Sequence, residues 1–285
     1  MVIRDDRVFI GLPVYNSVGT IEGSVRSILR QTHANWVLVI RDNQSNDGTF
    51  ELCCEIAKED PRILVHRNEA NIGAWPNFIR LIQQSDTTYF KWHAADDEIS
   101  DDFLEVNIQY LNAHSNAVGS FSKDATRSAL ENGIGYHLHD FCGSFDDKFR
   151  KFLDNAPNSN AAFYALFWSE VKNVLDPEEE ISDSLIQDWK FVLKALNLGD
   201  IVRAPGAETL MGERGFSTVK FSWLRLLPTT LNRVFPYLSF IKGTLPLLRN
   251  LNSSNKKYYL GFLLKQHLNI YKGLVLYWLR GNRNG

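Results

Sequence analysis

The first third of the chain alternates short apolar runs with longer stretches of helical periodicity. The apolar runs cover residues 8–12, 36–40, 63–65 and 87–92, and the first of them ends at Pro13. The apolar positions between these runs recur three or four residues apart: Ile21, Val25, Ile28 and Leu29; Leu52 and Ile56; Phe78, Leu81 and Ile82. Short apolar runs separated by amphipathic helices are typical of a parallel α/β sheet. We therefore predict three βα units in an α/β, Rossmann-like half sheet.

The pattern continues less regularly beyond Asp97. It predicts a helix over 103–111, a strand over 118–121, a helix over 184–196 that ends by Gly199, and a strand at 201–202. The sequence contains no internal repeat and no low-complexity segment.

Polar residues follow each of the four predicted strands of the first third. They are Tyr15 and Asn16, Asp42 and Asn43, Asn71 with Gly73, and Asp96 with Asp97. Ligands of an open parallel sheet bind at the carboxyl ends of its strands, so these four groups are expected to form one site. Neither G-x-G-x-x-G nor G-x-x-x-x-G-K-[ST] occurs after the first strand, which weighs against dinucleotide binding and a P-loop.

The acidic run Asp96-Asp97-Glu98 comes directly after a predicted buried strand. Adjacent carboxylates repel each other and are usually stabilised by a cation. Mg²⁺ or Mn²⁺, bound by one or two carboxylates together with substrate phosphates, fits this environment. The alternative is a solvated helix N-terminus, because acidic residues are favoured there as well.

Five segments in a fixed order then carry a family resemblance. They are Pro13-Val14-Tyr15-Asn16, Gln31-Thr32, Asp42 to Thr49, Asn71-Ile72-Gly73 and Asp96-Asp97. Together they resemble the motifs of the family 2 inverting glycosyltransferases, which have the GT-A fold. The resemblance covers about residues 7–218, and five motifs in order are more specific than any one of them.

The resemblance implies a nucleotide site on the shared rim. The implied nucleotide-binding residues are Pro13, Tyr15, Asn16, Asp42, Asn71, Gly73 and Asp96. In the family, the segment that matches Tyr15 wraps the nucleotide base, which implies that Tyr15 lies beside a uracil. The family's carboxylate after the second strand accepts a hydrogen bond from the base, and Asp42 matches it. Two structural alternatives stay open: Tyr15 as a loop anchor, and Asp42 as the start of an Asx-turn.

The acidic motif departs from the family pattern. That pattern commonly reads Asp-x-Asp-Asp, and here Ala94 stands where the first Asp would be. Asp96 is then the best metal ligand, with Asp97 beside it. The ribose contact of the missing Asp is left open: His93 is a substitute, although a lone histidine is more often structural.

Inverting transfer needs a base that deprotonates the acceptor hydroxyl, and such a base contributes roughly 10²–10⁴-fold in rate. The family supplies it as an Asp that opens a late helix and is followed eleven residues later by Gly, which Asp188 and Gly199 resemble. Asp183 is the local competitor, and an ordinary surface Asp is the structural alternative. In the segment 211–218, Glu213 stands where the family frequently has His, and Arg214 is a candidate phosphate partner.

Charge divides the chain in two. The 285 residues carry a net charge of −2, but residues 1–213 hold 33 acidic against 19 basic residues (net −14), and residues 214–285 hold 12 basic and no acidic residues (net +12). We therefore predict a GT-A domain over 1–213 and a basic, aromatic-rich helical extension over 214–285. Three cysteines are too few for a disulfide framework, and no secretory signal is apparent, so a cytoplasmic location is expected.

The basic extension repeats its cations every 7–9 residues, close to two helical turns, with aromatic and aliphatic residues between them. Pro228, Pro236 and Pro246 are expected to divide it into short helices rather than one rod. Such helices fit an anionic membrane surface, which predicts a peripheral protein at the inner face of the cell membrane. The alternatives are packing on the acidic domain or a homo-oligomer; the apolar content argues against nucleic acid.

These inferences predict a metal-dependent, inverting, hexosyltransferase-type glycosyltransferase. It would move a sugar from a nucleotide-sugar donor, expected to be a UDP-sugar, to a saccharide or lipid-linked acceptor in cell-surface polysaccharide assembly. The alternatives are a nucleotidyltransferase, although Pro13 to Gly19 carries no cation for such a site, and a non-catalytic nucleotide-sugar-binding or scaffolding protein.

Overall fold

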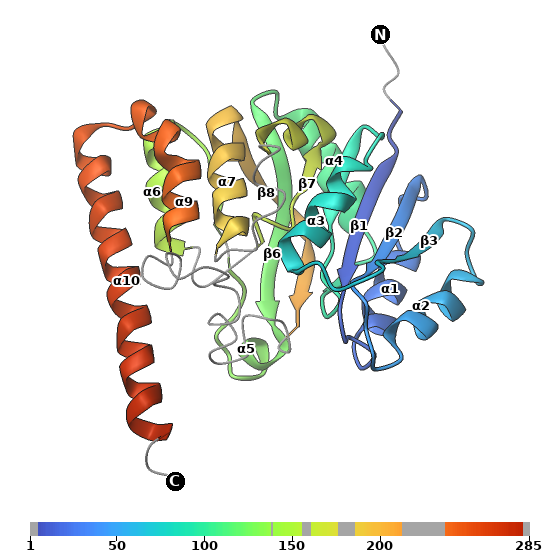
Figure 1. Ribbon diagram of the computed structural model, residues 1–285. Coiled ribbons are helices and arrows are strands. Elements are labelled where there is room, and N and C mark those ends of the chain that lie inside the picture. The colour runs from blue at the N-terminus through green and yellow to red at the C-terminus, as the bar shows by residue number, and fades with distance from the viewer. Residues whose placement is uncertain (1–4, 138, 156–160, 176–185, 213–236, 282–285) are drawn as a thin grey trace.

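A computed structural model describes residues 5–137, 139–155, 161–175, 186–212 and 237–281. An eight-stranded sheet lies between two layers of helices (Figure 1). The strands are β1 (Val8–Val14), β2 (Trp36–Asp42), β3 (Ile63–Arg67), β4 (Tyr89–Trp92), β5 (Glu98–Ile99), β6 (Ala117–Thr126), β7 (Leu166–Trp168) and β8 (Asp200–Met211). The α-helices are α1 (Ile21–Leu29), α2 (Thr49–Ala57), α3 (Ala74–Gln83), α4 (Phe103–Ala113), α5 (Arg127–Glu131), α6 (Phe145–Asn155), α7 (Gln187–Leu198), α9 (Leu238–Thr244) and α10 (Ser253–Gly281), with 3₁₀ segments η1 (Ser169–Val174) and η5 (Leu245–Asn250).

The predicted parallel half sheet is confirmed. Strands β3, β2, β1 and β4 are neighbours in that order and all are parallel, with Val8 opposite both Trp36 and Tyr89. The predicted end of the first strand was wrong, because β1 continues through Pro13 to Val14. β4 ends opposite Gly11, so the last part of β1 is paired on one side only, where a residue without an N–H is tolerated.

The other half of the sheet is mixed. β7 is antiparallel to both β4 and β6, β6 is parallel to β8, and β5 is antiparallel to β8. The sheet order is β3-β2-β1-β4-β7-β6-β8-β5. The sequence pattern did not predict β5, β7 or α6, and the helix expected over 184–196 is α7, described from residue 186 onward.

The two faces of the sheet have separate cores, because neighbouring residues of a strand point to opposite sides. Val8, Ile10 and Leu12 face α1, α2 and α4 in one hydrophobic cluster. Phe9 faces the other cluster, which α3, α6 and α7 cover. The second cluster is rich in aromatic rings: the Trp92 ring lies 4.7 Å from the Phe163 ring, measured between centroids.

The C-terminal helices share this second core. Tyr259 of α10 lies 5.7 Å from Phe149 of α6 between ring centroids, and Phe262 lies 6.0 Å from Trp189 of α7. The expectation of short helices was wrong beyond Pro246: no proline follows it, and α10 runs for 29 residues. None of the helices in the described ranges is long and apolar enough to cross a membrane. The predicted boundary at 213/214 lies outside the described residues.

Candidate functional site

The loop after β1 and the loop after β2 are joined at the rim. The backbone N–H of Asn16 donates to Ser45 Oγ at 2.9 Å, and the backbone N–H of Asn46 donates to Asn16 Oδ1 at 3.0 Å. Asn16 adopts a left-handed conformation with φ 52°, which Asn tolerates better than most residues. Pro13 lies in β1 opposite Arg41, and the Tyr15 side chain between these contacts is 48% exposed. The predicted base-binding tyrosine is therefore available at the surface of the rim.

Asp42 lies at the end of β2 but points inside the protein. Its side chain is 0% exposed, it accepts the Ser45 N–H at 3.1 Å, and its Oδ2 lies 3.2 Å from Arg67 Nε. The carboxylate therefore stabilises the turn and pairs with Arg67, as the structural alternative expects. A hydrogen bond to a base remains a prediction, and it would require Asp42 to share these partners. Arg67 was not identified from the sequence; its side chain is 34% exposed at this rim.

Three buried asparagines hold the third loop. Asn43 Nδ2 donates to Asn71 Oδ1 and to the Gly73 carbonyl, each at 3.0 Å. Asn68 Nδ2 donates to Asn43 Oδ1 at 3.0 Å and to Asn77 Oδ1 at 2.9 Å. Gly73 has φ 92°, in the region that favours glycine. The predicted nucleotide residues Asn71 and Gly73 are thus fixed to the end of β2 through a network that the sequence analysis missed.

The acidic pair separates into one buried and one accessible carboxylate. Asp97 is 7% exposed and accepts the Gly212 N–H at 2.9 Å. Burial raises the pKa of Asp97 to about 6, although the hydrogen bond from Gly212 acts in the opposite direction. Asp96 is partly exposed and lines an open cavity of about 220 Å³ with Glu98 and Arg127.

Gly212 allows the end of β8 to approach Asp96 closely. A Cβ atom at position 212 would lie 2.2 Å from Asp96 Oδ2 and 2.5 Å from Asp96 Cβ. Any side chain here would therefore displace the Asp96 carboxylate. Glu213 and Arg214, the next two residues of the predicted phosphate segment, lie outside the described residues.

Two buried basic side chains lie on β4 and just after it. Lys91 Nζ donates to the Tyr164 carbonyl at 2.5 Å and lies 4.7 Å from the centre of the Phe103 ring. Burial lowers the pKa of Lys91 to about 7 against the opposing effect of Asp97, and burial with Lys91 nearby lowers the pKa of His93 to about 3. His93 is 0% exposed, so the ring is inside the protein rather than at a ribose position.

The predicted base Asp188 and the acidic pair Asp96 and Asp97 all influence the buried side chain of Tyr164. Burial raises the pKa of Tyr164 well above its ordinary value, and the negative charges of Asp97, Asp188 and Asp96 raise it further. Asp188 lies in the first turn of α7, where acidic side chains are favoured, and is partly exposed. The fold therefore brings Asp188 near the side chain that Asp96 and Asp97 also influence, although Asp188 lies about 90 positions later in the chain. Asp183, the competitor, lies outside the described residues.

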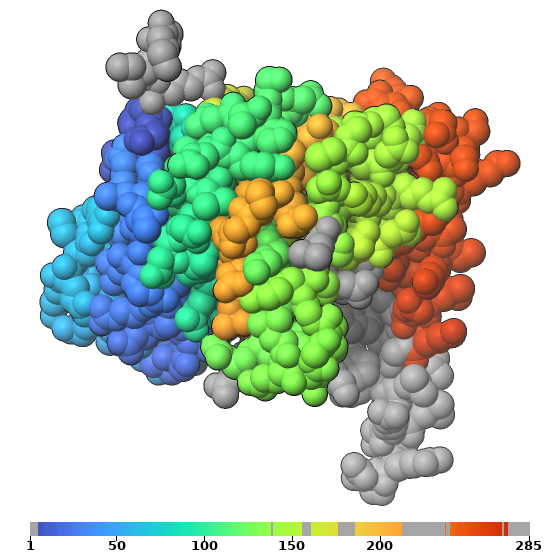
Figure 2. Space-filling model, turned by 180° about the vertical axis from the view of Figure 1, so that it is seen from behind, coloured from blue at the N-terminus to red at the C-terminus, as the bar shows by residue number. Residues whose placement is uncertain are grey.

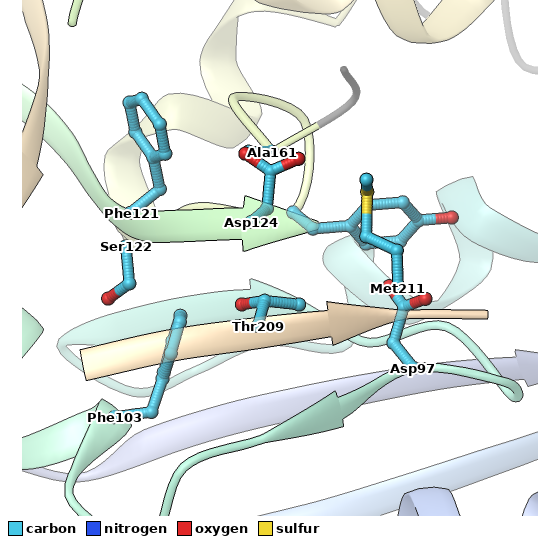
Figure 3. Close-up of a pocket in the computed structure, with 9 residues that line it drawn as sticks. Asp97, Phe103, Phe121, Ser122, Asp124, Ala161, Thr209 and Met211 are labelled. Carbon is cyan, nitrogen blue, oxygen red and sulfur yellow. The ribbon is translucent and has the colours of Figure 1, made fainter. Parts of the chain in front are cut away.

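A small cavity lies beside this cluster. Asp97, Tyr164, Asp124 and Thr209 are among its lining residues, and its volume of about 10 Å³ has room for about one water molecule (Figure 3). Asp124 is 0% exposed, and its Oδ2 lies 3.1 Å from His137 Nδ1. Asp124 was not identified from the sequence, because it lies beyond the predicted strand over 118–121 and belongs to no motif.

Asp96 and Asp97 are the residues predicted to bind a metal ion. Within the described ranges, no three His, Cys, Asp or Glu side chains are grouped so that they could hold an ion by themselves. Mg²⁺ commonly takes one or two carboxylates, and substrate phosphates and water complete its coordination. Asp96 fits that arrangement because it lines the larger, open cavity, whereas Asp97 lines the small one.

Comparison with known proteins gives a family match over the part of the chain that precedes α7. Residues 9–168 match the family model described as glycosyl transferase family 2. TuaG of Bacillus subtilis, named for teichuronic acid biosynthesis, is 32% identical over 99 residues, which is 35% of this chain and 39% of TuaG. WfgD of Escherichia coli, named as a UDP-Glc:α-D-GlcNAc-diphosphoundecaprenol β-1,3-glucosyltransferase, is 41% identical over 70 residues, which is 25% of this chain and 27% of WfgD. The matches thus span less than half the length of each relative.

Solved structures show the same fold. Staphylococcus aureus TarS (residues 1–349) in complex with UDP superposes with a TM-score of 0.52 at 17% identity, over 73% of this chain and 59% of TarS 1–349. The complex with UDP-GlcNAc has the same TM-score and identity, over 73% of this chain and 57% of that one. The predicted GT-A architecture, a mostly parallel sheet flanked by helices and followed by C-terminal helices, is confirmed.

Proposed function

The chain belongs to glycosyltransferase family 2, and on that premise we propose that it is a metal-dependent, inverting, hexosyltransferase-type enzyme that uses a UDP-sugar. One observation carries the proposal: the charge of Asp188 acts on the buried Tyr164 together with the charges of Asp96 and Asp97, so the three carboxylates lie near one side chain. This nearness supports Asp188 as the group that accepts the acceptor's proton and Asp96 as the group on the phosphate side of the donor. Asp96 follows β4 and the exposed Tyr15 follows the parallel neighbour β1, so both come after the carboxyl ends of adjacent strands.

The loops on this rim are assigned to the nucleotide. Tyr15 offers an exposed ring on which a uracil can stack, and Asn16 holds that loop to the loop after β2. Asn71 and Gly73 lie in the loop after β3, which Asn43 holds through two hydrogen bonds. Preformed loops lower the entropic cost of binding, because less of the chain has to be ordered around the ligand.

Asp188 is assigned as the general base. In inverting transfer, the acceptor hydroxyl attacks the anomeric carbon from the face opposite the diphosphate while a carboxylate takes its proton. Asp188 is partly exposed, at the start of a helix anchored in the core by Phe191 and Leu193. A rigid helix start can hold the carboxylate in one position while the acceptor approaches.

Asp96 is assigned as the ligand of Mg²⁺ or Mn²⁺, together with the donor diphosphate. When bound, the cation would neutralise the negative charge that develops on the leaving diphosphate. Asp97 is assigned a supporting role: its hydrogen bond from Gly212 fixes the end of β8 against Asp96.

The acceptor is proposed to be a saccharide or a lipid-linked sugar in cell-surface polysaccharide assembly, at the inner face of the cell membrane. Support comes from the relatives, since TuaG is named for teichuronic acid biosynthesis and WfgD for a diphosphoundecaprenol acceptor. A nucleotidyltransferase and a non-catalytic sugar-nucleotide-binding protein are the alternatives, and the position of Asp188 favours transfer over both.

A screen of nucleotide sugars for metal-dependent thermal stabilisation tests the donor class. We expect UDP-sugars with Mn²⁺ to raise the melting temperature and EDTA to abolish the effect. In calorimetry, Asp96→Ala should lose metal-dependent UDP binding, whereas Asp101→Ala, which removes an exposed carboxylate paired with Arg30, should bind normally. Equal UDP affinity of Asp96→Ala and the wild type would refute the metal assignment.

A further inference from the structure

Helix α10 exposes an apolar stripe along its outer side. Leu260, Leu264, Leu268 and Tyr271 are 63%, 62%, 51% and 38% exposed. Their spacings of four, four and three residues place them on one face of a helix. Leucines exposed to this degree in a continuous line are unusual for a solvated helix and indicate an interaction surface.

The orientation of α10 is fixed by its opposite face. The Tyr259 hydroxyl lies 2.6 Å from Thr244 Oγ1, and Asn255 Nδ2 donates to Asp146 Oδ1 at 2.9 Å. Phe262 and Leu263 are also buried, at 8% and 6% exposure. Because these contacts occupy the inner face, the helix cannot rotate to bury the stripe without losing them.

Cations accompany the stripe, and no acidic residue does. Lys256, Lys257, Lys265, Lys272 and Arg280 are the charged residues of α10, and the first four are exposed. Lys257 and Lys265 are each three or fewer residues from a leucine of the stripe, and Lys272 follows Tyr271 directly. The outer face is therefore apolar and basic together.

We infer that the stripe Leu260, Leu264, Leu268 and Tyr271 with the neighbouring lysines is a docking surface for an anionic lipid bilayer. A second copy of the chain is the other candidate occupant, but two α10 helices paired along this stripe would place lysines against lysines with no acid in either helix to offset them. Anionic headgroups supply the missing counter-charge. Leucine and tyrosine side chains can enter the acyl boundary while the lysine stems extend back to the headgroups.

The position of α10 suits this role. The helix runs along one edge of the molecule, as both views show (Figures 1 and 2). In Figure 1 it runs in the same general direction as β1, so its C-terminal end lies toward the side on which the strands' carboxyl ends form the rim. Lipid docking does not depend on the proposed transfer reaction, but it would bring the rim near a lipid-linked acceptor.

Vesicle co-sedimentation of the full chain tests the inference without any readout of turnover. Wild type is expected to bind vesicles of phosphatidylcholine mixed with phosphatidylglycerol, and to bind pure phosphatidylcholine at least about tenfold more weakly. Leu264→Ser/Leu268→Ser should lower the partition coefficient on anionic vesicles by at least about tenfold, since each leucine loses its burial in the bilayer. Lys265→Gln/Lys272→Gln should lower it by on the order of tenfold, because each cation near the surface contributes separately.

Matched substitutions elsewhere provide the control. Leu198→Ser removes a leucine that is 57% exposed at the end of α7, and Lys58→Gln removes an exposed lysine of the α2 terminus. Both should bind vesicles as the wild type does, and all four variants should melt as the wild type does, because the altered side chains are exposed. Failure of the wild type to bind anionic vesicles, or equal binding by the stripe variants, would overturn the inference. So would a dimer in sedimentation velocity that Leu264→Ser/Leu268→Ser dissociates, since the stripe would then belong to a second copy.

Discussion

His93 is expected to make the folded chain sensitive to mild acid. The ring is 0% exposed, and it lies near the backbone of Ser24 and Asp97, yet neither ring nitrogen has a hydrogen-bond partner of normal geometry among the described residues. An imidazolium in this position would be a buried charge without a counter-ion, with the Lys91 ammonium nearby. The folded state therefore keeps the imidazole neutral.

The size of the effect follows from the two pKa values. Folding lowers the pKa of His93 from 6.5 to about 3, so between these values the unfolded chain binds a proton that the folded chain does not. The free energy of unfolding consequently rises with pH across this window and falls on acidification. About pH 4.5 lies two pH units below the ordinary pKa of 6.5. Protonation of His93 in the unfolded chain then lowers the free energy of unfolding by about 3 kcal/mol, which is about a hundredfold in the folding equilibrium constant.

Urea denaturation at about pH 7.5 and about pH 4.5 measures this term. The free energy of unfolding of the wild type should fall on going from about pH 7.5 to about pH 4.5. His93→Gln removes the titrating group, so the fall should be smaller in this variant by about 3 kcal/mol. His66→Gln removes an exposed histidine of β3 and should lose as much stability as the wild type. Only the change with pH is compared, so an altered stability of His93→Gln at neutral pH does not affect the result.

Two results would show that burial does not keep His93 neutral in the folded state. One is an equal loss of stability on acidification in His93→Gln and the wild type. The other is an NMR titration in which the His93 ring protonates near its ordinary pKa of 6.5 while the chain stays folded.

Two further substitutions test how the rim is held together. Gly212→Ala places a Cβ 2.2 Å from Asp96 Oδ2 and should lower metal-dependent UDP affinity by about tenfold or more in calorimetry. Gly261→Ala is the control, because its new Cβ would meet nothing within 4 Å, and it should leave the UDP affinity unchanged. Equal UDP affinities of Gly212→Ala and the wild type would contradict the role of Gly212. Asn68→Ala removes the donor that lies 2.9 Å from the buried Asn77 Oδ1. The free energy of unfolding, measured by urea denaturation, should fall by about 2 kcal/mol. A fall of less than about 0.5 kcal/mol would mean that the fold does not need this network.

The location of the site could be predicted from the sequence, because a parallel sheet places the residues after each strand on one rim. Tyr15, Asn71 and Asp96 needed only that rule and the apolar runs before them. The start of a helix at Asp188 came from the family resemblance, because the apolar pattern alone predicts a helix from residue 184, whereas α7 begins at Gln187.

The orientation of individual side chains could not be predicted. Asp42 turns inward because Arg67, 25 residues later on β3, reaches it, and Asp97 is buried because Gly212, 115 residues later, donates to it. Such pairs leave no local pattern in the sequence. β7 and β5, of three and two residues, are too short to show any periodicity.

The central claim is that the chain transfers a sugar with Asp188 as its base. The most direct measurement is turnover of the UDP-sugar identified in the screen, by wild type and Asp188→Asn, with UDP affinity measured on the same samples. We expect the variant to bind UDP as the wild type does and to lose roughly 10²-fold or more in kcat. Wild-type kcat in Asp188→Asn, with UDP binding intact, would contradict it.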